Sequence, residues 1–546
     1  MLMLPRSLIA LLLQALIVLP PSTHAQPQSR SSSATPPIPS PSSILPRPST
    51  RLGINSLTPF TLSNLPSPPV FSIPATDESI SITIASCSID VAFSSTRFFL
   101  SNESSIPDPG PDDLEDPGVW EIALNSTGVG EWTGPLTQGG FLSVSSGGPS
   151  GQQQTFEVAV SSTGPTHTSG ASLPLLGDTT SNIALLFSPP FAPPPRIQPT
   201  YPNYTLPAAN LTFPPEPTDP PNYQLFIAPT SALSSAGIPR TGCALRAAAG
   251  GAGTGMRLLS SEQSEGMWLR DEAEGWRWQW LVQGLAPSTN YTAFAVLDGT
   301  KVSDEIMFST KSGGFACPLV HSLPYCPRTA YAIPMDPPPA PGIAHDASTL
   351  PATLTDPLLS YLTNFTTSLL THPCGRDLYS PLVTCSDCQE AYRKWLCTVS
   401  FPRCGEPRPD DPSVAGTTPT TNSRRHSSSF LNSFRSFASF SNSNTQPQQP
   451  LSALLPQSTT TPPRNQFWPS FSSPYSVLLP CLETCTAVDR ACPVMLGFKC
   501  PIPRFTASLS YGVGFVDSGE EGEESQGKGI VGTASDQWGN VWCNAG

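Results

Sequence analysis

The chain is 546 residues long, which is enough for two or three domains, and it contains 67 prolines, while only 12% of its residues are charged. The formal net charge of −13 argues against nucleic acid and anionic lipid as partners. Of the 14 cysteines, 12 lie from Cys317 onward. The composition therefore predicts a multidomain chain with extensive unpacked segments and a cysteine-rich C-terminal part.

Residues 1–25 have the pattern of a secretory signal peptide. Arg6 precedes an unbroken apolar run from Leu8 to Leu19, and small residues follow up to a cleavage point near Ala25. That run has 12 residues, whereas a membrane-spanning helix needs about 20. We therefore expect a cleaved signal and entry into the secretory pathway, with an uncleaved N-terminal anchor as the alternative.

Several glycosylation sequons are typical of an extracellular protein. The candidate sites are Asn102, Asn125, Asn203, Asn210, Asn290 and Asn364. An exported chain meets an oxidising compartment, where cysteines form disulfides, so we expect up to seven of them in an undetermined pairing. The candidates in the cysteine-rich part are Cys317, Cys326, Cys374, Cys385, Cys388, Cys397, Cys404, Cys481, Cys485, Cys492, Cys500 and Cys543.

A Ser/Pro-rich stretch, a Pro-rich connector and two strand-rich blocks precede the cysteine-rich part. Residues 26–77 predict a disordered linker, because Ser and Pro cannot build a core. Short alternating segments bounded by Gly, Pro, Ser or Asn predict a β-sandwich over 78–200. A Pro-rich connector, 201–221, leads to a second strand-rich block, 222–313.

Within the second block, GLAPSTNYTAFAV resembles the turn of fibronectin type III domains. The matching residues are Leu285, Pro287, Thr289 and Tyr291. The resemblance implies a second sandwich, in which the hydroxyl of Tyr291 forms a tyrosine-corner hydrogen bond.

The cysteine-rich part, 314–404 and 471–546, has a helical pattern. On a helix, Cys385 and Cys388 share one side with Tyr392, Trp395 and Leu396, which we expect in the core. A second helix is predicted after Pro480, with Cys481, Cys485 and Cys492 on one face and its end at Pro493. Residues 405–470 predict a disordered low-complexity insert.

The C-x-x-C pair has two alternative interpretations. Cys385, Cys388, Cys397 and Cys404 have tolerable spacing for a zinc site, but an oxidising compartment favours disulfides. A redox pair is disfavoured because no βαβ pattern precedes Cys385. The chain lacks G-x-S-x-G and H-E-x-x-H motifs, so we expect no enzyme activity, cofactor, metal or small-molecule substrate.

Two segments resemble the C-terminal domain of fungal stretch-activated calcium channel regulatory subunits, the MID family. They are CGRDLYSPLVTCSDCQEAYRKWLCTVSFPRC and PYSVLLPCLETCTAVDRACPVMLGFKCP, and Cys543 completes the pattern. Animal sodium-leak channel auxiliary factors have a similar domain, which is likened to the Frizzled type. The fold implied is a mainly β N-terminal part with two β-sandwich-like domains, followed by a disulfide-stapled, largely helical, Frizzled-like cysteine-rich domain.

The resemblance implies an accessory subunit that docks on a large four-repeat calcium channel pore and supports calcium influx. Such a protein lies at the extracellular face of the plasma membrane, and also in the endoplasmic reticulum, and is held at the membrane through its partner. A secreted cell-wall or adhesion glycoprotein is the alternative, and a Frizzled-like domain that binds a lipid or secreted ligand is a further one.

Overall fold

The computed structural model describes residues 50–88, 96–146, 154–170, 172–195, 200–251, 254–407, 453–458, 462–502, 507–512 and 538–546. The predicted signal peptide and most of the predicted insert lie outside these residues. The described residues form mainly β-sheets, with five α-helices. Seven disulfides join them, six of which lie from Cys317 onward. The prediction of a mainly β N-terminal part is confirmed.

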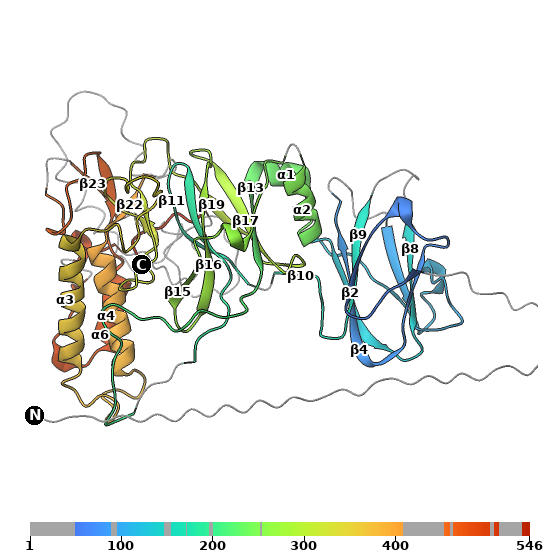
Figure 1. Cartoon of the computed structure of the whole chain (residues 1–546), viewed down its shortest axis with the longest axis horizontal. Helices are drawn as coiled ribbons and strands as arrows, with labels where there is room; N and C mark the ends of the chain where they lie inside the picture. Colours follow the sequence, from blue (N-terminus) through green and yellow to red (C-terminus); the bar gives the residue numbers. More distant parts are fainter. Residues whose placement is uncertain are drawn as a thin grey trace, which may run out of the picture. The chain divides into compact units, whose positions relative to one another are not determined.

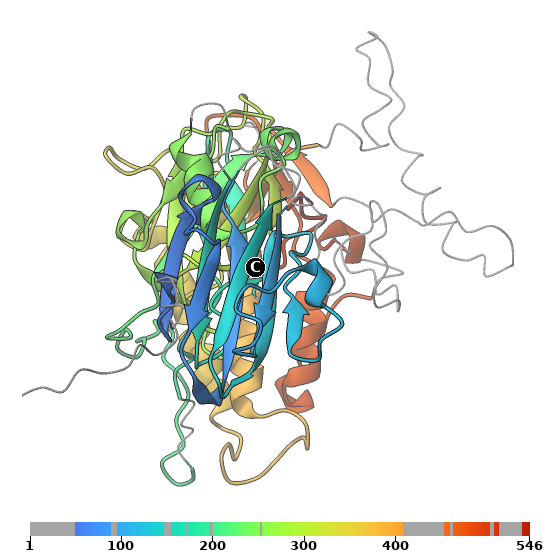
Figure 2. The ribbon, with the colours of Figure 1, turned by 90° about the vertical axis from the view of Figure 1, so that its right-hand side faces the viewer.

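Two sheets, which we call the first sheet pair, form the N-terminal part (Figure 2). In sheet order, one contains β1 (Thr50–Arg51), β3 (Val70–Ile73), β8 (Gly140–Ser146), β5 (Thr96–Ser101) and β6 (Val119–Glu121). The other contains β2 (Ser56–Thr61), β9 (Thr155–Ser161), β4 (Thr76–Ser86) and β7 (Val129–Leu136).

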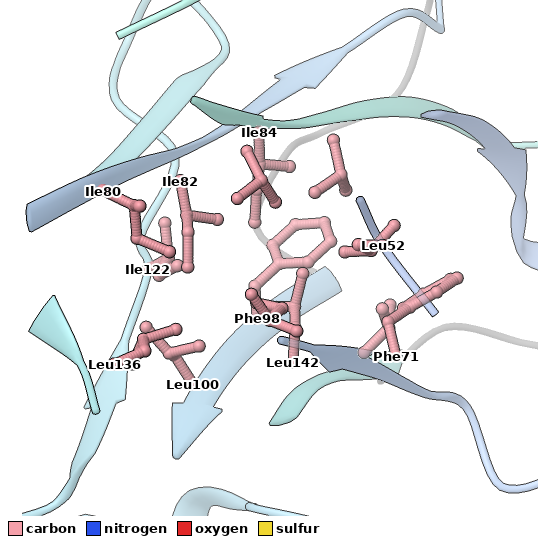
Figure 3. Packing of buried hydrophobic residues seen from close by; sticks show 14 of the residues in the cluster. Leu52, Phe71, Ile80, Ile82, Ile84, Phe98, Leu100, Ile122, Leu136 and Leu142 are labelled. Atoms are coloured by element: carbon pink, nitrogen blue, oxygen red, sulfur yellow. The ribbon is translucent and has the colours of Figure 1, made fainter. Parts of the chain in front are cut away.

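One hydrophobic cluster fills the first sheet pair (Figure 3). Ile80, Ile82 and Ile84 of β4 share a face because side chains alternate along a strand, and all three are fully buried. They meet Phe98 and Leu142, which come from β5 and β8 of the other sheet. Both sheets therefore contribute to a single core.

Part of the predicted linker 26–77 is strand, which departs from the expectation. Residues 50–73 contribute β1, β2 and β3, and the rings of Phe60 and Phe71 pack with centroids 5.3 Å apart. Pro59 is compatible with β2 because this strand lies at a sheet edge, where a missing backbone donor costs little. Because Ser and Pro dominate the composition of the whole stretch, its short apolar runs were not recognised as strands.

A second sheet pair follows. One sheet runs β10 (Thr168–Ser169), β18 (Lys301–Val302), β17 (Asn290–Leu297), β13 (Tyr223–Pro229) and β14 (Arg257–Leu259), with β19 (Ile306–Ser309) also on β17. The other runs β11 (Leu175–Thr179), β12 (Ile183–Phe187), β16 (Gly275–Gln283) and β15 (Met267–Asp271). Helices α1 (Thr230–Ala236) and α2 (Gly242–Gly250) lie between β13 and β14 in the chain.

Strands β10, β11 and β12 were expected in the first block, 78–200, but β10 pairs with β18, β12 pairs with β16, and β11 joins that second sheet through β12. Such pairings join residues about a hundred positions apart, which local alternation cannot reveal. The tyrosine-corner prediction is confirmed, because the backbone N–H of Ala286 donates to the Tyr291 hydroxyl at 2.8 Å.

The cysteine-rich region, from residue 314 onward, combines three helices with short strands. The helices α3 (Ala352–Leu369), α4 (Cys385–Ser400) and α6 (Leu482–Ala491) lie side by side (Figure 1). The strands are β20 (Leu319–Val320), β21 (Tyr331–Ala332), β22 (Arg403–Gly405), β23 (Leu454–Gln457) and β24 (Tyr475–Leu478). The two helices predicted around the cysteines are confirmed as α4 and α6.

The predicted insert 405–470 is ordered at both ends, which departs from the expectation. β22 ends at Gly405, and β23 pairs with β24. Trp468 is buried, and its indole N–H donates to the carbonyl oxygen of Pro334 at 2.7 Å. A single tryptophan in a Ser/Pro-rich context gives no periodic signal, so the sequence pattern did not indicate this packing.

A buried ion pair joins the second sheet pair to the cysteine-rich region. Arg403 Nε donates to Asp178 Oδ2 at 2.8 Å, and Lys311 Nζ lies 3.8 Å from Asp178 Oδ1. Backbone N–H groups of Thr179 and Ala332 donate to the same carboxylate. Burial by itself raises the pKa of Asp178, but the charges of Arg403 and Lys311 outweigh it, and the net pKa lies below the ordinary value.

Candidate docking site

The two sulfurs of the C-x-x-C pair face different partners. Both cysteines lie in the first turn of α4, where Thr384 caps the helix: its hydroxyl accepts from the Asp387 N–H, while the Asp387 carboxylate accepts from the Thr384 N–H. Cys385 bonds to Cys374, and Cys388 bonds to Cys492 at the end of α6. The two cysteines therefore link the start of α4 both to the segment that precedes it and to the end of α6.

The remaining cysteines are also paired. The other disulfides are Cys317–Cys404, Cys326–Cys397, Cys481–Cys543, Cys485–Cys500 and Cys87–Cys243. The Cys87–Cys243 disulfide joins the end of β4, in the first sheet pair, to α2. All four sulfurs of the alternative zinc site are bonded to other cysteines, which leaves no thiolate for a metal.

The aromatic residues of α4 pack between the helices. Tyr392 stacks on Phe365 of α3 with ring centroids 3.6 Å apart. Trp395 meets Phe498 edge-on at 4.9 Å, and its indole N–H donates to the Tyr511 hydroxyl at 2.9 Å. Leu396 is buried, whereas Tyr392 and Trp395 are half-buried.

Two loops at the ends of these helices expose large apolar side chains. We call them the apolar loops, residues 375–384 before α4 and 492–502 after α6. The exposed fractions are 78% for Leu378, 89% for Leu382, 88% for Val494, 88% for Met495 and 59% for Ile502. Exposed apolar side chains mark an interaction site where they form a contiguous patch.

Covalent bonds and one tyrosine hold the apolar loops together. Cys374–Cys385, Cys388–Cys492 and Cys485–Cys500 anchor their ends. The Tyr379 hydroxyl lies 2.6 Å from the carbonyl oxygen of Thr384, in its own loop, and 2.7 Å from that of Ala491, the last residue of α6, so it can donate to either carbonyl group. Burial, followed by the charge of Asp387, raises the pKa of Tyr379 to about 12, so the donor stays protonated at neutral pH.

The predicted glycosylation sites are spread outside the apolar loops. Asn102 is half-buried, and the other candidates, Asn125, Asn203, Asn210, Asn290 and Asn364, are exposed. Asn125 Oδ1 accepts hydrogen bonds from Thr127 and Val129 backbone N–H groups.

The sequence predicts the helices and cysteines of this site but not its exposed side chains. The segments LYSPLV and PVML are short apolar runs broken by proline, and they lie between cysteines. Their position between cysteines and outside the predicted helices is the signal that could distinguish them from core residues.

Among the residues that the structure describes, no helix combines the length and the apolar composition needed to cross a bilayer.

Comparison with known families identifies the group to which the chain is related. The model of the family Mid1, described as the stretch-activated Ca2+-permeable channel component, matches residues 80–528. The chain belongs to this family. The resemblance inferred from the cysteine segments is therefore confirmed.

Three fungal relatives share this assignment. The chain is 37% identical over 409 residues to the stretch-activated cation channel MID1 of Cryptococcus neoformans, covering 71% of this chain and 62% of that protein. It is 28% identical over 242 residues to the stretch-activated cation channel yam8 of Schizosaccharomyces pombe, covering 43% and 40%. It is 28% identical over 246 residues to MID1 of Saccharomyces cerevisiae, covering 42% and 36%. The chain thus spans less than two thirds of the length of these relatives.

Solved structures give only weak matches. A pre-peptidase C-terminal domain of a Bacillus anthracis collagenase covers 21% of this chain and 97% of that domain at 15% identity, with a TM-score of 0.14. A two-domain fibronectin type III segment of chicken tenascin covers 44% and 95% at 11% identity, with a TM-score of 0.13. These scores are too low to support a fold assignment.

Proposed function

We propose that this protein is an extracellular accessory subunit of a stretch-activated or voltage-gated-like calcium channel, and that it docks on a large four-repeat pore subunit through the apolar loops. It supports calcium influx by assembling with the pore and does not conduct ions itself. Membership of a family of channel components supports the general role. The exposed side chains and the covalent anchoring of the apolar loops support the proposal that these loops form the docking surface.

The apolar loops carry the proposal because they combine exposure with rigidity. Burial of one Leu, Val or Met side chain stabilises a complex by about 1.5–3 kcal/mol before the costs of association. Leu382, Val494 and Met495 are each almost fully exposed, so each has this contribution available. The disulfides and Tyr379 restrict the loops before binding, which lowers the entropy that is lost on docking.

The two sheet pairs are proposed to be sandwich-like domains that project from a Frizzled-like cysteine-rich domain. Each sheet pair has a core to which both of its sheets contribute. In this arrangement the glycosylated sheets face the cell wall, and the cysteine-rich region faces the pore. The protein would enter the secretory pathway, pass through the endoplasmic reticulum and remain at the outer face of the plasma membrane through its partner.

The proposal is tested by affinity purification of the epitope-tagged full chain from detergent-solubilised membranes, in non-reducing buffer, with mass spectrometry of co-purified proteins. We expect a very large four-repeat channel polypeptide. The double variant Leu382→Asp with Met495→Asp should lower the affinity for that polypeptide about 100-fold, because two apolar contacts are lost.

The matched control is Leu114→Asp with Leu173→Asp, which places the same charges at exposed leucines outside the apolar loops. This control should co-purify the pore as the wild type does. Recovery of the chain from the wall or the medium without a channel polypeptide would instead favour the secreted cell-wall glycoprotein. Equal recovery of the pore by both double variants would exclude the apolar loops as the docking surface.

A further inference from the structure

The Pro-rich connector, residues 201–221, belongs to the second sheet pair by its place in the chain, but it reaches the cysteine-rich region. The chain leaves the second sheet pair after β12 and returns to it at β13. On this return, Phe213 packs edge-on against Trp268 of β15 with ring centroids 4.9 Å apart. The indole N–H of Trp278 donates to the carbonyl oxygen of Pro221 at 2.9 Å. One end of the connector is therefore fixed on the second sheet pair.

The middle of the connector is fixed on α4 by two buried side chains. Arg393 donates to the carbonyl oxygens of Ala208 and Ala209. The Gln389 amide donates to the carbonyl oxygen of Pro207 at 2.7 Å. Both donors are buried, and a buried donor that loses its acceptor is costly. Three consecutive carbonyl groups of the connector are therefore held in one position along α4.

Tyr204 places the connector against the first of the apolar loops, residues 375–384. Gly375 at the start of this loop has a φ of 77°, which favours glycine. A Cβ atom on Gly375 would collide with the ring and the Cβ atom of Tyr204. Tyr204 also borders a cavity of about 210 Å³ whose other walls come mainly from residues 375–379 and 383–385. The side chain of Tyr204 therefore lies directly against the backbone of the loop.

Tyr204 also packs against the cluster that closes both apolar loops. This cluster contains Cys374, Cys385 and Cys492, whose disulfides anchor the ends of the loops. Two residues separate Tyr204 from Pro207. The hydrogen bond that holds Pro207 on α4 therefore also limits the positions open to the Tyr204 ring. The contacts form a series that runs from α4 through the connector to the loop.

We propose that the connector is a clasp that positions the docking surface. Arg393 and Gln389 fix the connector on α4, and Tyr204 then holds residues 375–384 in the conformation that exposes Leu378 and Leu382. Tyr204 and Arg393 are positioning residues, because the exposed apolar surface is formed by other side chains. The second sheet pair and the cysteine-rich region thus build this surface together. The consequence for docking rests on the proposed function, whereas the positioning of the loop needs no pore subunit.

The test is hydrogen exchange of the purified full chain, measured for variants at Tyr204. Tyr204→Ala should speed exchange in residues 375–384 by about tenfold, because the loop loses the ring that packs against it. Tyr204→Phe keeps the ring and should keep the wild-type rate. Both substitutions preserve the sequon of Asn203, so the predicted glycosylation is not altered. The control Glu216→Ala changes an exposed connector residue outside these contacts and should leave the rate unchanged.

The variant Arg393→Met tests whether Arg393 acts through Tyr204. Alone, it should also speed exchange in residues 375–384, although its hydrogen bonds are made to the connector and to Tyr325. In the Tyr204→Ala background it should add little, because the ring through which it acts is gone. Thermal unfolding shows whether each variant is folded. If Arg393→Met does not fold, Gln389→Met takes its place by removing the hydrogen bond to Pro207.

An unchanged rate in Tyr204→Ala, or additive effects of the two substitutions, would overturn the proposal. Recovery of the pore subunit tests the consequence for docking: Tyr204→Ala should bind it about tenfold more weakly, because a loosened loop loses more entropy on docking, and Tyr204→Phe should bind it as the wild type does. Faster exchange with unchanged recovery would overturn the link between the clasp and docking. If the wild type itself recovers no pore subunit, the proposed function fails, and exchange in residues 375–384 alone decides whether the connector positions this loop.

Discussion

The first sheet pair and the cysteine-rich region are stabilised in different ways. The sheets of the first pair enclose one continuous hydrophobic cluster, and their only described disulfide leads out of the pair to α2. The cysteine-rich region divides its buried residues among four clusters, one of which is as large as that of the first sheet pair, while two others consist largely of cysteines and aromatic rings. Six disulfides cross this region.

The difference shows which part of the molecule can expose apolar residues. A single large core stabilises a sheet pair through buried area, and it requires apolar side chains to face inward. Crosslinks stabilise a fold mainly by limiting the unfolded chain, so Leu378, Leu382, Val494 and Met495 need not contribute to a core. The cysteine-rich region can therefore present a rigid apolar surface.

The largest effect is expected from removing the disulfide between α4 and α6. In Cys388→Ser with Cys492→Ser, a crosslink spanning 104 residues is lost, which should lower the free energy of unfolding of this region by about 4–5 kcal/mol. Hydrogen exchange of α4, α6 and the apolar loops should become faster. Strands β4 and β9 should keep their protection, because their core does not involve these cysteines.

The matched control for that prediction removes a long-range crosslink outside the cysteine-rich region, in Cys87→Ser with Cys243→Ser. It should leave exchange in α4 and α6 unchanged. Faster exchange of β4 and β9 in the Cys388 variant would mean that the two regions do not unfold separately.

The next effect is expected at the ion pair that joins the second sheet pair to the cysteine-rich region. Asp178→Asn leaves Arg403 buried without its charge partner, which should cost about 3–5 kcal/mol. Urea unfolding at neutral pH measures the loss, and hydrogen exchange should place it at β11, β21 and β22. A loss of less than 1 kcal/mol (about a fivefold change in the unfolding constant) would contradict the assigned role.

The same pair predicts a pH dependence. The pKa of Asp178 is lowered in the folded chain, so its stabilisation is complete above the ordinary Asp value and is lost as the pH falls through the lower folded value. The difference between the wild type and Asp178→Asn should therefore stay constant from pH 7 to about 5 and decrease below about 4. Glu305→Gln, which removes an exposed ion pair with Arg240, is the control and should show little effect.

The smallest effect is expected in the first core. Ile82→Val removes one fully buried methyl group and should cost about 0.5–1.5 kcal/mol, because the neighbouring side chains relax only partly. The loss should appear as faster exchange in β4 and its neighbours without reduced recovery of the pore. Impaired recovery would indicate that the first sheet pair also contributes to docking.

Local patterns predicted some elements but not their partners. The helical spacing of Cys385, Cys388 and Tyr392 predicted α4, and the residues around Tyr291 predicted the tyrosine corner. These features depend on neighbours in sequence. The pairing of β12 with β16 and that of Cys388 with Cys492 depend on residues far apart in the chain, so no local pattern could supply them.

The proposed docking surface could not be predicted from the sequence for a different physical reason. Leu382 and Met495 are apolar, and an apolar residue in a sequence is expected to be buried. Only the three-dimensional arrangement shows that the disulfides hold these side chains in exposed loops. Residues 201–221 were expected only to connect two strand-rich blocks, whereas Arg393 and Gln389 anchor this connector on α4.

The most direct test of the docking account is hydrogen exchange of the full chain, measured alone and in the complex purified with the pore subunit. We expect slower exchange on complex formation in the apolar loops, residues 375–384 and 492–502, and unchanged exchange in β2, β4 and β9. Protection confined to the sheet pairs, with unchanged exchange in the apolar loops, would contradict the account.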